Sequence, residues 1–449
     1  MRTSSGNRLT LLWTGVISAG MVAGFNLPDK NPKKIKPNFI IIYTDDQGYN
    51  DLGCYGSQTI KTPRLDQMAR EGVRFTSFYA QPVSGPSRGA LMTGRYPLRI
   101  GDGWLVNSNE VTIAEVLKKE DYSTGCIGKW DMSKRKELEG SVPNDQGFGY
   151  YYGTLGANDN GFVRIYRNKE ALFLTYDMGS LTNLYTEEAI TFIKNNKEKP
   201  FFLYLAYSMP HVKLDASPQF KGKSAGELYG DVIEELDWNV GRIFEIVREL
   251  RLENNTYILF ASDNGPWSSR EELYRSKLGG QLGTGNSKPL RSSKGSPYEG
   301  GFRVPCIFWG AGRVKEGLTQ NGILSNLDIM PTFVKLAGAK IPKGIVPDGY
   351  NQARFMTGET RKSARNLFYY HIKGELQAVR YKNWKLLVPK TTLNFPYVKD
   401  PERQSPELYD LGNDISEKIN VAEKYPVVTK KLLKIVKKGP NKPDPLAIP

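Results

Sequence analysis

The chain has 449 residues, of which 39% are hydrophobic, and it carries a formal net charge of +15 and only three cysteines. This length and composition predict a globular protein of two or three structural units, or one large unit with an appendage. The charge would attract anionic partners, but no nucleic-acid-binding motif accompanies it, so we expect no nucleic-acid partner. Three cysteines allow at most one disulfide, and none has the paired spacing of a zinc site.

The first 25 residues have the layout of a secretory signal peptide. Arg2 and Arg8 precede a mixed apolar run, and small residues cluster around Ala23 and Gly24 at its end. A permanent membrane anchor is the alternative, but it needs about 20 uniformly apolar residues, and this run is shorter and diluted. We therefore predict a signal peptide over residues 1–25, a secreted or periplasmic location after cleavage, and no stable membrane insertion.

Three short apolar runs in the following chain are typical of strands buried on both faces of a sheet. They lie at residues 38–43, 201–207 and 257–262. Helical patterns lie between them, at residues 62–71, 112–119 and 230–250. This alternation predicts an α/β fold in which helices flank a large, mostly parallel sheet, with ligands bound beyond the carboxyl ends of the strands.

The pattern changes at about residue 364, where shorter alternating strands begin. They are expected at residues 367–371, 376–381, 384–388 and 407–411, before a final basic amphipathic helix. This order predicts a small antiparallel sheet with a helix. We therefore divide the mature chain into an α/β catalytic domain, residues 33–363, and a small C-terminal α+β subdomain, residues 364–449.

Oxygen ligands follow two of the predicted strands. Asp45 and Asp46 end the first strand, and Asp263 and Asn264 end the strand at 257–262. Such a set suits a hard divalent cation, Ca²⁺ or Mg²⁺, and does not suit zinc. Asp45 and Asp46 can share an ion only if the chain turns there, because adjacent strand residues point to opposite faces. The alternative is that each carboxylate only closes a turn.

A serine with a proline and an arginine precedes another helical run in the segment QPVSGPSRGALMTGR, residues 81–95. Pro86 suits the first turn of a helix, which places Ser84 at the helix N-terminus beside free N–H groups. Arg88, one turn further on, adds a cation. The alternative for Ser84 is an ordinary helix cap.

Several short motifs occur in one order along nearly the whole mature chain. They are Asp45-Asp46 with Gly48, DLGCYG at 51–56, Ser84-x-Pro86-Ser87-Arg88 with LMTGR at 91–95, GKW at 128–130, Pro210-His211, YGD at 229–231 with EELD at 234–237, SDNG at 262–265, and KGS at 294–296 with YEGG at 298–301 and RVP at 303–305. Together they resemble the formylglycine-dependent sulfatases, most closely the arylsulfatase A-like branch. The resemblance implies the alkaline-phosphatase-like fold.

The resemblance also implies roles for these residues. Ser84 would be oxidised to formylglycine by a serine-type maturation enzyme, and its hydrated aldehyde would be the nucleophile. One Ca²⁺, with Mg²⁺ as the other possibility, would be held by Asp45, Asp46, Ser84, Asp263 and Asn264. Arg88 would stabilise the formylglycine hydroxylate, Lys129 and Lys294 would hold sulfate oxygens, and His211 would protonate the leaving alcohol.

Each role has a plainer alternative. Lys129 and Lys294 follow or precede glycines, as solvated loop lysines often do, and His211 could simply satisfy a backbone carbonyl. His211 and His371 are the only histidines in the chain, and only His211 is expected near the crevice. The chain also departs from the family at Asp131, where these sulfatases usually have histidine. Asp131 could accept the nucleophile's proton, or it could turn away while another group substitutes.

The leading interpretation is an exported sulfatase that hydrolyses sulfate esters, with a sulfated carbohydrate as the expected substrate. Tyr150–Tyr152, residues 158–160 and Arg164 are candidate contacts at the rim, and the equal alternative for the tyrosines is packing in the core or in a loop. One alternative is a phosphate or phosphonate monoester hydrolase of the same superfamily, although the shortage of histidine argues against a two-zinc site. A second alternative is a degenerate sulfatase that binds sulfated glycans without turnover.

Overall fold

The computed structural model describes residues 36–134, 138–267, 285–390, 395, 398 and 402–439. All of these residues belong to one compact unit. The predicted signal peptide, residues 1–25, lies outside the described residues and stays a prediction. Within the described ranges, no helix is both long and apolar enough to cross a membrane.

A ten-stranded sheet forms the centre of the molecule, and its middle is parallel, as predicted. The central strands, in spatial order, are β9 (Thr256–Ser262), β1 (Asn38–Thr44), β8 (Phe201–Ala206), β4 (Ser123–Lys129) and β5 (Tyr150–Thr154). Each pairs with its neighbour in parallel; for example, Ile41 of β1 lies opposite Leu259 of β9 and Tyr204 of β8. The carboxyl ends of these strands therefore meet at one edge of the sheet.

Antiparallel strands extend the sheet on both sides. Beyond β9 lie β11 (Cys306–Trp309), β2 (Val73–Phe75) and β12 (Leu318–Gln320), and beyond β5 lie β6 (Val163–Arg167) and β7 (Glu170–Thr175). β12 pairs in parallel with β2, and the other four pairings outside the central strands are antiparallel. The result is a mixed, mostly parallel sheet.

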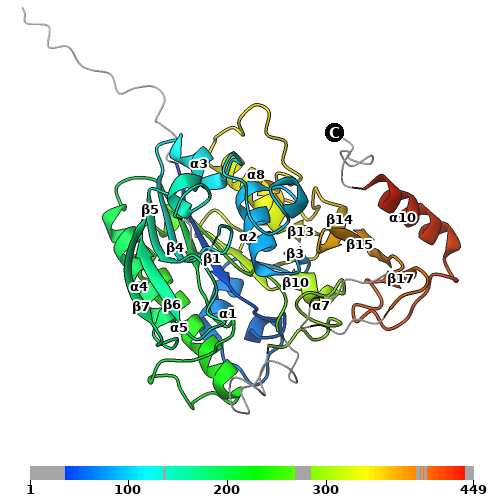
Figure 1. Ribbon diagram of the computed structural model, residues 1–449, viewed down its shortest axis with the longest axis horizontal. Coiled ribbons are helices and arrows are strands. Elements are labelled where there is room, and N and C mark those ends of the chain that lie inside the picture. Colours follow the sequence, from blue (N-terminus) through cyan, green and yellow to red (C-terminus); the bar gives the residue numbers. More distant parts are fainter. Residues whose placement is uncertain are drawn as a thin grey trace, which may run out of the picture. The chain divides into compact units, whose positions relative to one another are not determined.

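Helices cover both faces of the sheet because β1 is apolar on both faces. Phe39 and Ile41 pack in one cluster with side chains of α2 (Ser84–Thr93), α3 (Ile113–Lys118) and α8 (Ile329–Leu336). Ile40 and Ile42 pack in the other with α1 (Pro63–Arg70), α4 (Leu181–Asn195) and α5 (Glu227–Glu249). Figure 1 shows these helices on the two sides of the sheet.

Two smaller sheets complete the fold. A three-stranded sheet contains β10 (Arg303–Val304), β3 (Phe78–Tyr79) and β13 (Leu324–Ser325). An antiparallel sheet contains β14 (Leu367–Ile372), β15 (Glu375–Tyr381), β16 (Trp384–Leu387) and β17 (Glu407–Asp410), and α10 (Pro426–Lys438) packs with it. The predicted C-terminal α+β architecture is confirmed, whereas the boundary at residue 364 stays a prediction. The other helices within the described residues are α7 (Glu299–Phe302), α9 (Ala353–Met356), η1 (Gly53–Tyr55), η2 (Pro97–Arg99), η3 (Pro143–Gln146), η4 (Glu253–Asn255) and η5 (Asn326–Asp328).

A buried charge network joins the C-terminal sheet to the rest of the unit. The Glu299 carboxylate in α7 pairs with Lys385 Nζ of β16 at 2.9 Å and with Arg303 Nη1 at 3.3 Å, and it accepts a hydrogen bond from Tyr370 of β14 at 2.7 Å. Lys385 also contacts Glu417 at 2.8 Å. Burial alone would raise the pKa of Glu299, but Lys385 and the arginines outweigh it and lower that pKa. Glu299 is therefore charged at neutral pH and holds the two parts together.

Removing this charge should destabilise the protein strongly. Glu299→Gln keeps the side-chain volume but leaves buried cations without their carboxylate, so we expect the free energy of unfolding to fall by about 3–5 kcal/mol. Denaturant unfolding measures it. Glu359→Gln is the matched control, because Glu359 pairs with Arg354 at 3.5 Å on the surface and should contribute less than about 1 kcal/mol. Similar losses for both variants would contradict the structural role of Glu299.

Candidate active site

The oxygen ligands predicted at two strand ends come together in the structure. β1 ends at Thr44 and β9 at Ser262, and the two strands are parallel neighbours, so Asp45, Asp46, Asp263 and Asn264 emerge at the same edge. Asp46 has a φ of 65°, in the left-handed region, and this is the turn that two adjacent aspartates need in order to face one site. One oxygen each from Asp45 and Asp46 and one ring nitrogen of His211 lie within 4.8 Å of one another.

Three oxygens of this cluster are buried and have no hydrogen-bond partner. They are Oδ1 of Asp45, Oδ2 of Asp46 and Oδ1 of Asn264. A buried polar atom without a partner is costly, so a group of three in one place needs an explanation. Two carboxylate oxygens and one amide oxygen form the donor set of a hard divalent cation, and the residues present therefore fit such an ion.

Ser84 is the first residue of α2, as the position of Pro86 predicted, but it does not cap the helix. Val83 is the N-cap residue and α2 has no side-chain cap. The Ser84 hydroxyl donates to Asp263 Oδ2 at 2.7 Å and accepts from Arg88 Nε at 2.8 Å. Ser84 thus points toward the ligand cluster, beside the positive end of the helix.

Arg88 is fully buried and connects several parts of the site. Its Nη2 pairs with Asp263 Oδ2 at 2.8 Å, and its Nη1 donates to the Lys129 carbonyl and to the Tyr204 hydroxyl, each at 3.2 Å. Although burial acts to lower it, the pKa of Arg88 is raised by Tyr204, Asp263 and Asp45. Arg88 is therefore a fixed cation at the entrance of α2.

Lys129 and Lys294 are buried, which rules out the solvated-loop alternative for both. Lys129 Nζ lies 2.5 Å from Asp45 Oδ2, and Lys294 Nζ lies 2.6 Å from Asp46 Oδ1. Burial acts to lower both lysine pKa values, but nearby carboxylates outweigh it and raise them, led by Asp131 for Lys129 and by Asp46 for Lys294. Both lysines are therefore cationic.

His211 follows β8 and uses its two ring nitrogens differently. Nδ1 lies 2.5 Å from the Val212 carbonyl oxygen, so the local contact named as an alternative is present. Nε2 faces the site, 3.7 Å from Asp46 Oδ2 and 3.7 Å from Asp159 Oδ1. Burial lowers the pKa of His211 to about 4, although Asp46 opposes this. The imidazole is therefore neutral at neutral pH in the protein alone.

Asp131 lies inside the site and does not turn away from it. Its Oδ2 is 3.3 Å from Lys129 Nζ, and the residue is buried with a φ of 54°. Lys129 supplies the cation that a carboxylate needs beside an anionic ligand. The sequence did not single out Tyr204, because its place inside a continuously apolar strand gave no signal of a polar role.

The predicted rim contacts are only partly at the site. Asn158 Nδ2 donates to the His211 carbonyl at 3.2 Å, and Asp159 faces His211. Tyr151 and Tyr152 instead lie in the core, and Tyr150 begins β5 at the opposite end of the sheet. Of the two interpretations left open for these tyrosines, the structure supports packing over rim contacts, because β5 is an inner strand whose side chains pack against both helix layers.

The buried charges of the site do not balance. The members are the carboxylates of Asp45, Asp46, Asp131 and Asp263 and the cations of Arg88, Lys129 and Lys294. Four negative and three positive charges leave a formal charge of −1 while His211 is neutral. One divalent cation would change this to +1, which suits a singly charged anionic substrate.

Comparison with known proteins agrees with this geometry. The Sulfatase family model matches residues 37–339, and the model described as N-sulphoglucosamine sulphohydrolase, C-terminal, matches residues 293–440. The chain is 30% identical to an N-acetylgalactosamine-6-O-sulfatase of Bacteroides thetaiotaomicron, over 91% of this chain and 94% of that protein.

Two solved structures are also similar. One, from work on glycosaminoglycan metabolism in Bacteroides thetaiotaomicron, has a TM-score of 0.81 at 26% identity and covers 91% of this chain and 100% of its own. The other, Ps i-CgsB in complex with k-i-k-neocarrahexaose, has a TM-score of 0.75 at 32% identity and covers 91% and 94%. The chain therefore belongs to the sulfatase family, whose members are sulfuric ester hydrolases with the alkaline-phosphatase-like fold.

Proposed function

We propose that this sulfatase is exported and hydrolyses sulfate esters on a sulfated carbohydrate, with a formylglycine made from Ser84 and one Ca²⁺. The observation that carries the proposal is the Ser84 hydroxyl, which lies between Arg88 and Asp263 beside three buried, unpartnered oxygens. The N-acetylgalactosamine-6-O-sulfatase relative and the carbohydrate-bound structure support the substrate class. The net charge of +15 also favours an anionic substrate.

The chain's own residues divide the work. Asp45, Asp46, Asp263 and Asn264 would hold the ion together with position 84. A bound divalent cation would supply positive charge beside a sulfate oxygen. A hydrated aldehyde at position 84 would supply two hydroxyls on one carbon, so that one can take up the sulfuryl group and the other can release it.

The remaining side chains bind the substrate and move protons. Lys129 and Lys294 hold sulfate oxygens, in exchange for their present contacts with Asp45 and Asp46. Arg88 stabilises negative charge at position 84 through its contact with that side chain. The Nδ1 contact with the Val212 carbonyl orients the His211 ring and places its one proton on Nδ1, so Nε2 is unprotonated in the neutral ring. Nε2 must therefore take up a proton when the anionic substrate binds, before His211 can pass that proton to the leaving alcohol.

Two other functions remain testable. A two-metal phosphate or phosphonate hydrolase needs more ligands, and the metal-ligating cluster in the described residues contains one histidine. A binding protein without turnover would follow if Ser84 stayed unconverted. The contact between Asp131 and Lys129 favours an enzyme over a binding protein without turnover, because it keeps within the site a carboxylate that can accept a proton.

Co-expression with a serine-type maturation enzyme tests the function. Conversion of Ser84 should lower the mass of its peptide by about 2 Da, as mass spectrometry would show. The matured protein should release sulfate from N-acetylgalactosamine 6-sulfate or from carrageenan oligosaccharides, and should cleave an aryl sulfate at least about 100-fold faster than an aryl phosphate. Ser84→Ala is the inactive control. Complete conversion without sulfate release would instead indicate a binding protein, and faster phosphate release would indicate a phosphatase.

Metal binding can be measured without turnover. Ca²⁺ at about 100 times its Kd should stabilise the protein by about 2.7 kcal/mol, seen as a rise in Tm, because the ion binds only the folded site. Asp46→Asn should abolish this rise, since it removes a ligand charge. Asp159→Asn is the control, because Asp159 lies at the rim and is not a proposed ligand. Equal Ca²⁺ responses in the wild type and Asp46→Asn would contradict the site, and parallel titration with Mg²⁺ gives the preferred ion.

The role of Asp131 has a separate test. If Asp131 accepts the proton of the nucleophile, Asp131→Asn should lower kcat/KM on an aryl sulfate by at least about 100-fold. The acidic limb of the pH profile should change as well, which a purely structural loss would not cause. Asp145→Asn, on the surface pair with Lys169, serves as the control. An unchanged pH profile would show that Asp131 only balances the charge of Lys129.

A further inference from the structure

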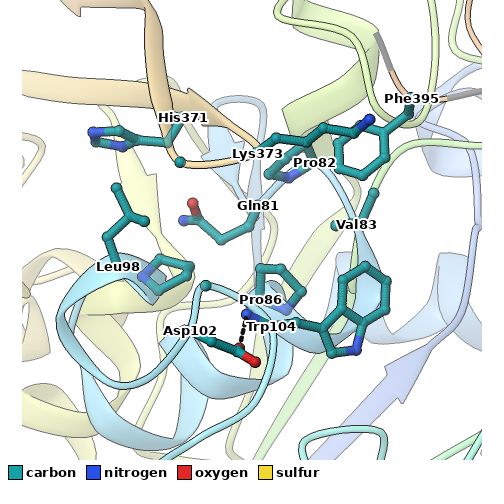
Figure 2. A pocket seen from close by; sticks show the side chains of 13 residues that line it. Gln81, Pro82, Val83, Pro86, Leu98, Asp102, Trp104, His371, Lys373 and Phe395 are labelled. Atoms are coloured by element: carbon teal, nitrogen blue, oxygen red, sulfur yellow. Dashed lines mark hydrogen bonds between the residues drawn. The ribbon is translucent and has the colours of Figure 1, made fainter. Parts of the chain in front are cut away.

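A cavity of about 340 Å³ lies beside the first turn of α2, and it is lined by residues that flank Ser84. Gln81, Val83 and Pro86 form part of one wall. The opposite wall is formed by His371 near the end of β14 and by Lys373 in the turn between β14 and β15, as Figure 2 shows. The cavity thus lies between the α/β sheet's helix α2 and the C-terminal sheet, and its volume is at the lower end of the range of small-ligand sites.

The cavity contains polar groups that the protein does not satisfy. Oε1 of Gln81 and Nδ1 of His371 are buried without a hydrogen-bond partner, and these residues are 0% and 7% exposed. Burial also lowers the pKa of His371 to about 4, so the ring is neutral at neutral pH and offers an acceptor nitrogen as well as a donor. Hydroxyl groups, which both donate and accept, suit both positions. His371 thus lines this cavity, whereas His211 lies with Asp45 and Asp46.

An aromatic ring stands at the edge of this cavity next to the reaction centre. Trp104 is 36% exposed, and its indole lies so close to Gly85 that a Cβ there would be 2.5 Å from Trp104 Nε1. Gly85 directly follows Ser84, so the indole stands beside the position of the nucleophile. A flat, partly exposed indole provides an apolar face together with an N–H donor, which is how aromatic side chains commonly contact ligands that are partly apolar and partly polar.

The charges of the cavity lie on different walls. Asp102 Oδ1 accepts hydrogen bonds from the backbone N–H groups of Trp104 and Leu105, at 2.8 and 2.7 Å, so Asp102 orders the loop that carries the indole. Lys373 lies on the other wall, in a left-handed turn with a φ of 46°, and its Nζ is 5.1 Å from the centre of the Phe395 ring. Figure 2 shows Asp102 and Trp104 on one side and Lys373 on the other.

We propose that this cavity binds the sugar unit next to the sulfated one, with Trp104 as the platform for its ring, Gln81 and His371 as partners of its hydroxyls, and Lys373 as the contact for an anionic substituent. This inference rests on the proposed function. Trp104 and Lys373 are then specificity-determining residues, which select an oligosaccharide over a single sulfated sugar and take no part in the sulfate chemistry.

Substrates of two lengths test the proposal. The matured enzyme is assayed on N-acetylgalactosamine 6-sulfate and on chondroitin 6-sulfate and carrageenan oligosaccharides, with an aryl sulfate as the short reference. Trp104→Ala should lower kcat/KM on the oligosaccharide that is cleaved by at least about tenfold, with the aryl sulfate within about twofold of wild type. Lys373→Gln should lower the ratio of kcat/KM on the oligosaccharide to kcat/KM on the aryl sulfate by about threefold to fivefold. Trp104→Phe should retain most of the wild-type kcat/KM on the oligosaccharide, because it keeps an aromatic ring at this position.

The chain offers matched controls for both variants. Tyr425 is 37% exposed, close to the value for Trp104, and Tyr425→Ala should leave the ratio unchanged. Lys382 occupies the equivalent left-handed turn position between β15 and β16, with a φ of 53°, so Lys382→Gln controls for loss of a turn lysine. Calorimetric titration of unconverted protein with the same oligosaccharides measures binding without turnover.

The outcomes separate the two proposals. If Trp104→Ala and Lys373→Gln cleave and bind the oligosaccharides within twofold of wild type, the cavity is not a sugar site, while the sulfatase function stands. If both variants lose activity equally on the aryl sulfate and the oligosaccharide, the residues act on the reaction centre and the subsite proposal is wrong. If the wild type neither binds nor cleaves any of these saccharides while it cleaves the aryl sulfate, the proposed carbohydrate substrate fails and the subsite fails with it.

Discussion

The neutralisation of charge at the carboxyl ends of β1 and β9 is the constraint on which this molecule depends. Four carboxylates and three cations are buried there together, and removing so many charges from water is costly unless each finds a partner of opposite sign. Asp45 is in contact with Lys129, Asp46 with Lys294, and Asp263 with Arg88. The three oxygens without a hydrogen-bond partner are those that suit a divalent cation. The ion pairs that lower the free-energy cost of burying these charges therefore also define the candidate metal site.

The parallel sheet makes this arrangement possible because it brings distant segments to one edge. Ser84 and Asp263 are 179 residues apart in the chain, and their side chains are 2.7 Å apart. Arg88 links α2, β4, β8 and the end of β9, so Ser84, the proposed nucleophile position, has a rigid support. Rigid placement matters here because electrostatic stabilisation works best when the charges need not move during the reaction.

The C-terminal sheet contributes through the way it is attached to the rest of the unit. It attaches to the rest of the unit through an aromatic cluster and through Glu299 of α7, whose charge is satisfied by side chains of β14, β15 and β16 and by Arg303 of β10. This attachment sets the turn between β14 and β15 next to the residues that flank Ser84. The large sheet thus brings together the side chains of the candidate active site, and we infer that the small sheet adds selectivity.

The fold class, the central strands, the C-terminal sheet and the cluster of oxygen ligands could all be predicted from the sequence, because they depend on local patterns. Continuous apolar runs followed by Asp-Asp or Asp-Asn identify buried strands and their polar ends without knowledge of the rest of the chain. The order of the motifs was equally informative about the family. Pro86 likewise placed Ser84 correctly, since the effect of proline on a first helical turn is local.

Long-range packing decided the rest. The pairing of Asp131 with Lys129, the contact of Arg88 with Tyr204 and the cavity shared by Trp104, His371 and Lys373 join residues whose neighbours in sequence give no sign of the contact. The sequence left the tyrosines of β5 open between the rim and the core for the same reason, because only the folded sheet shows that β5 is an inner strand with helices on both sides. Local composition predicts which groups a strand end offers, whereas the partner of each group depends on which strands become neighbours, and that is a property of the whole folded chain.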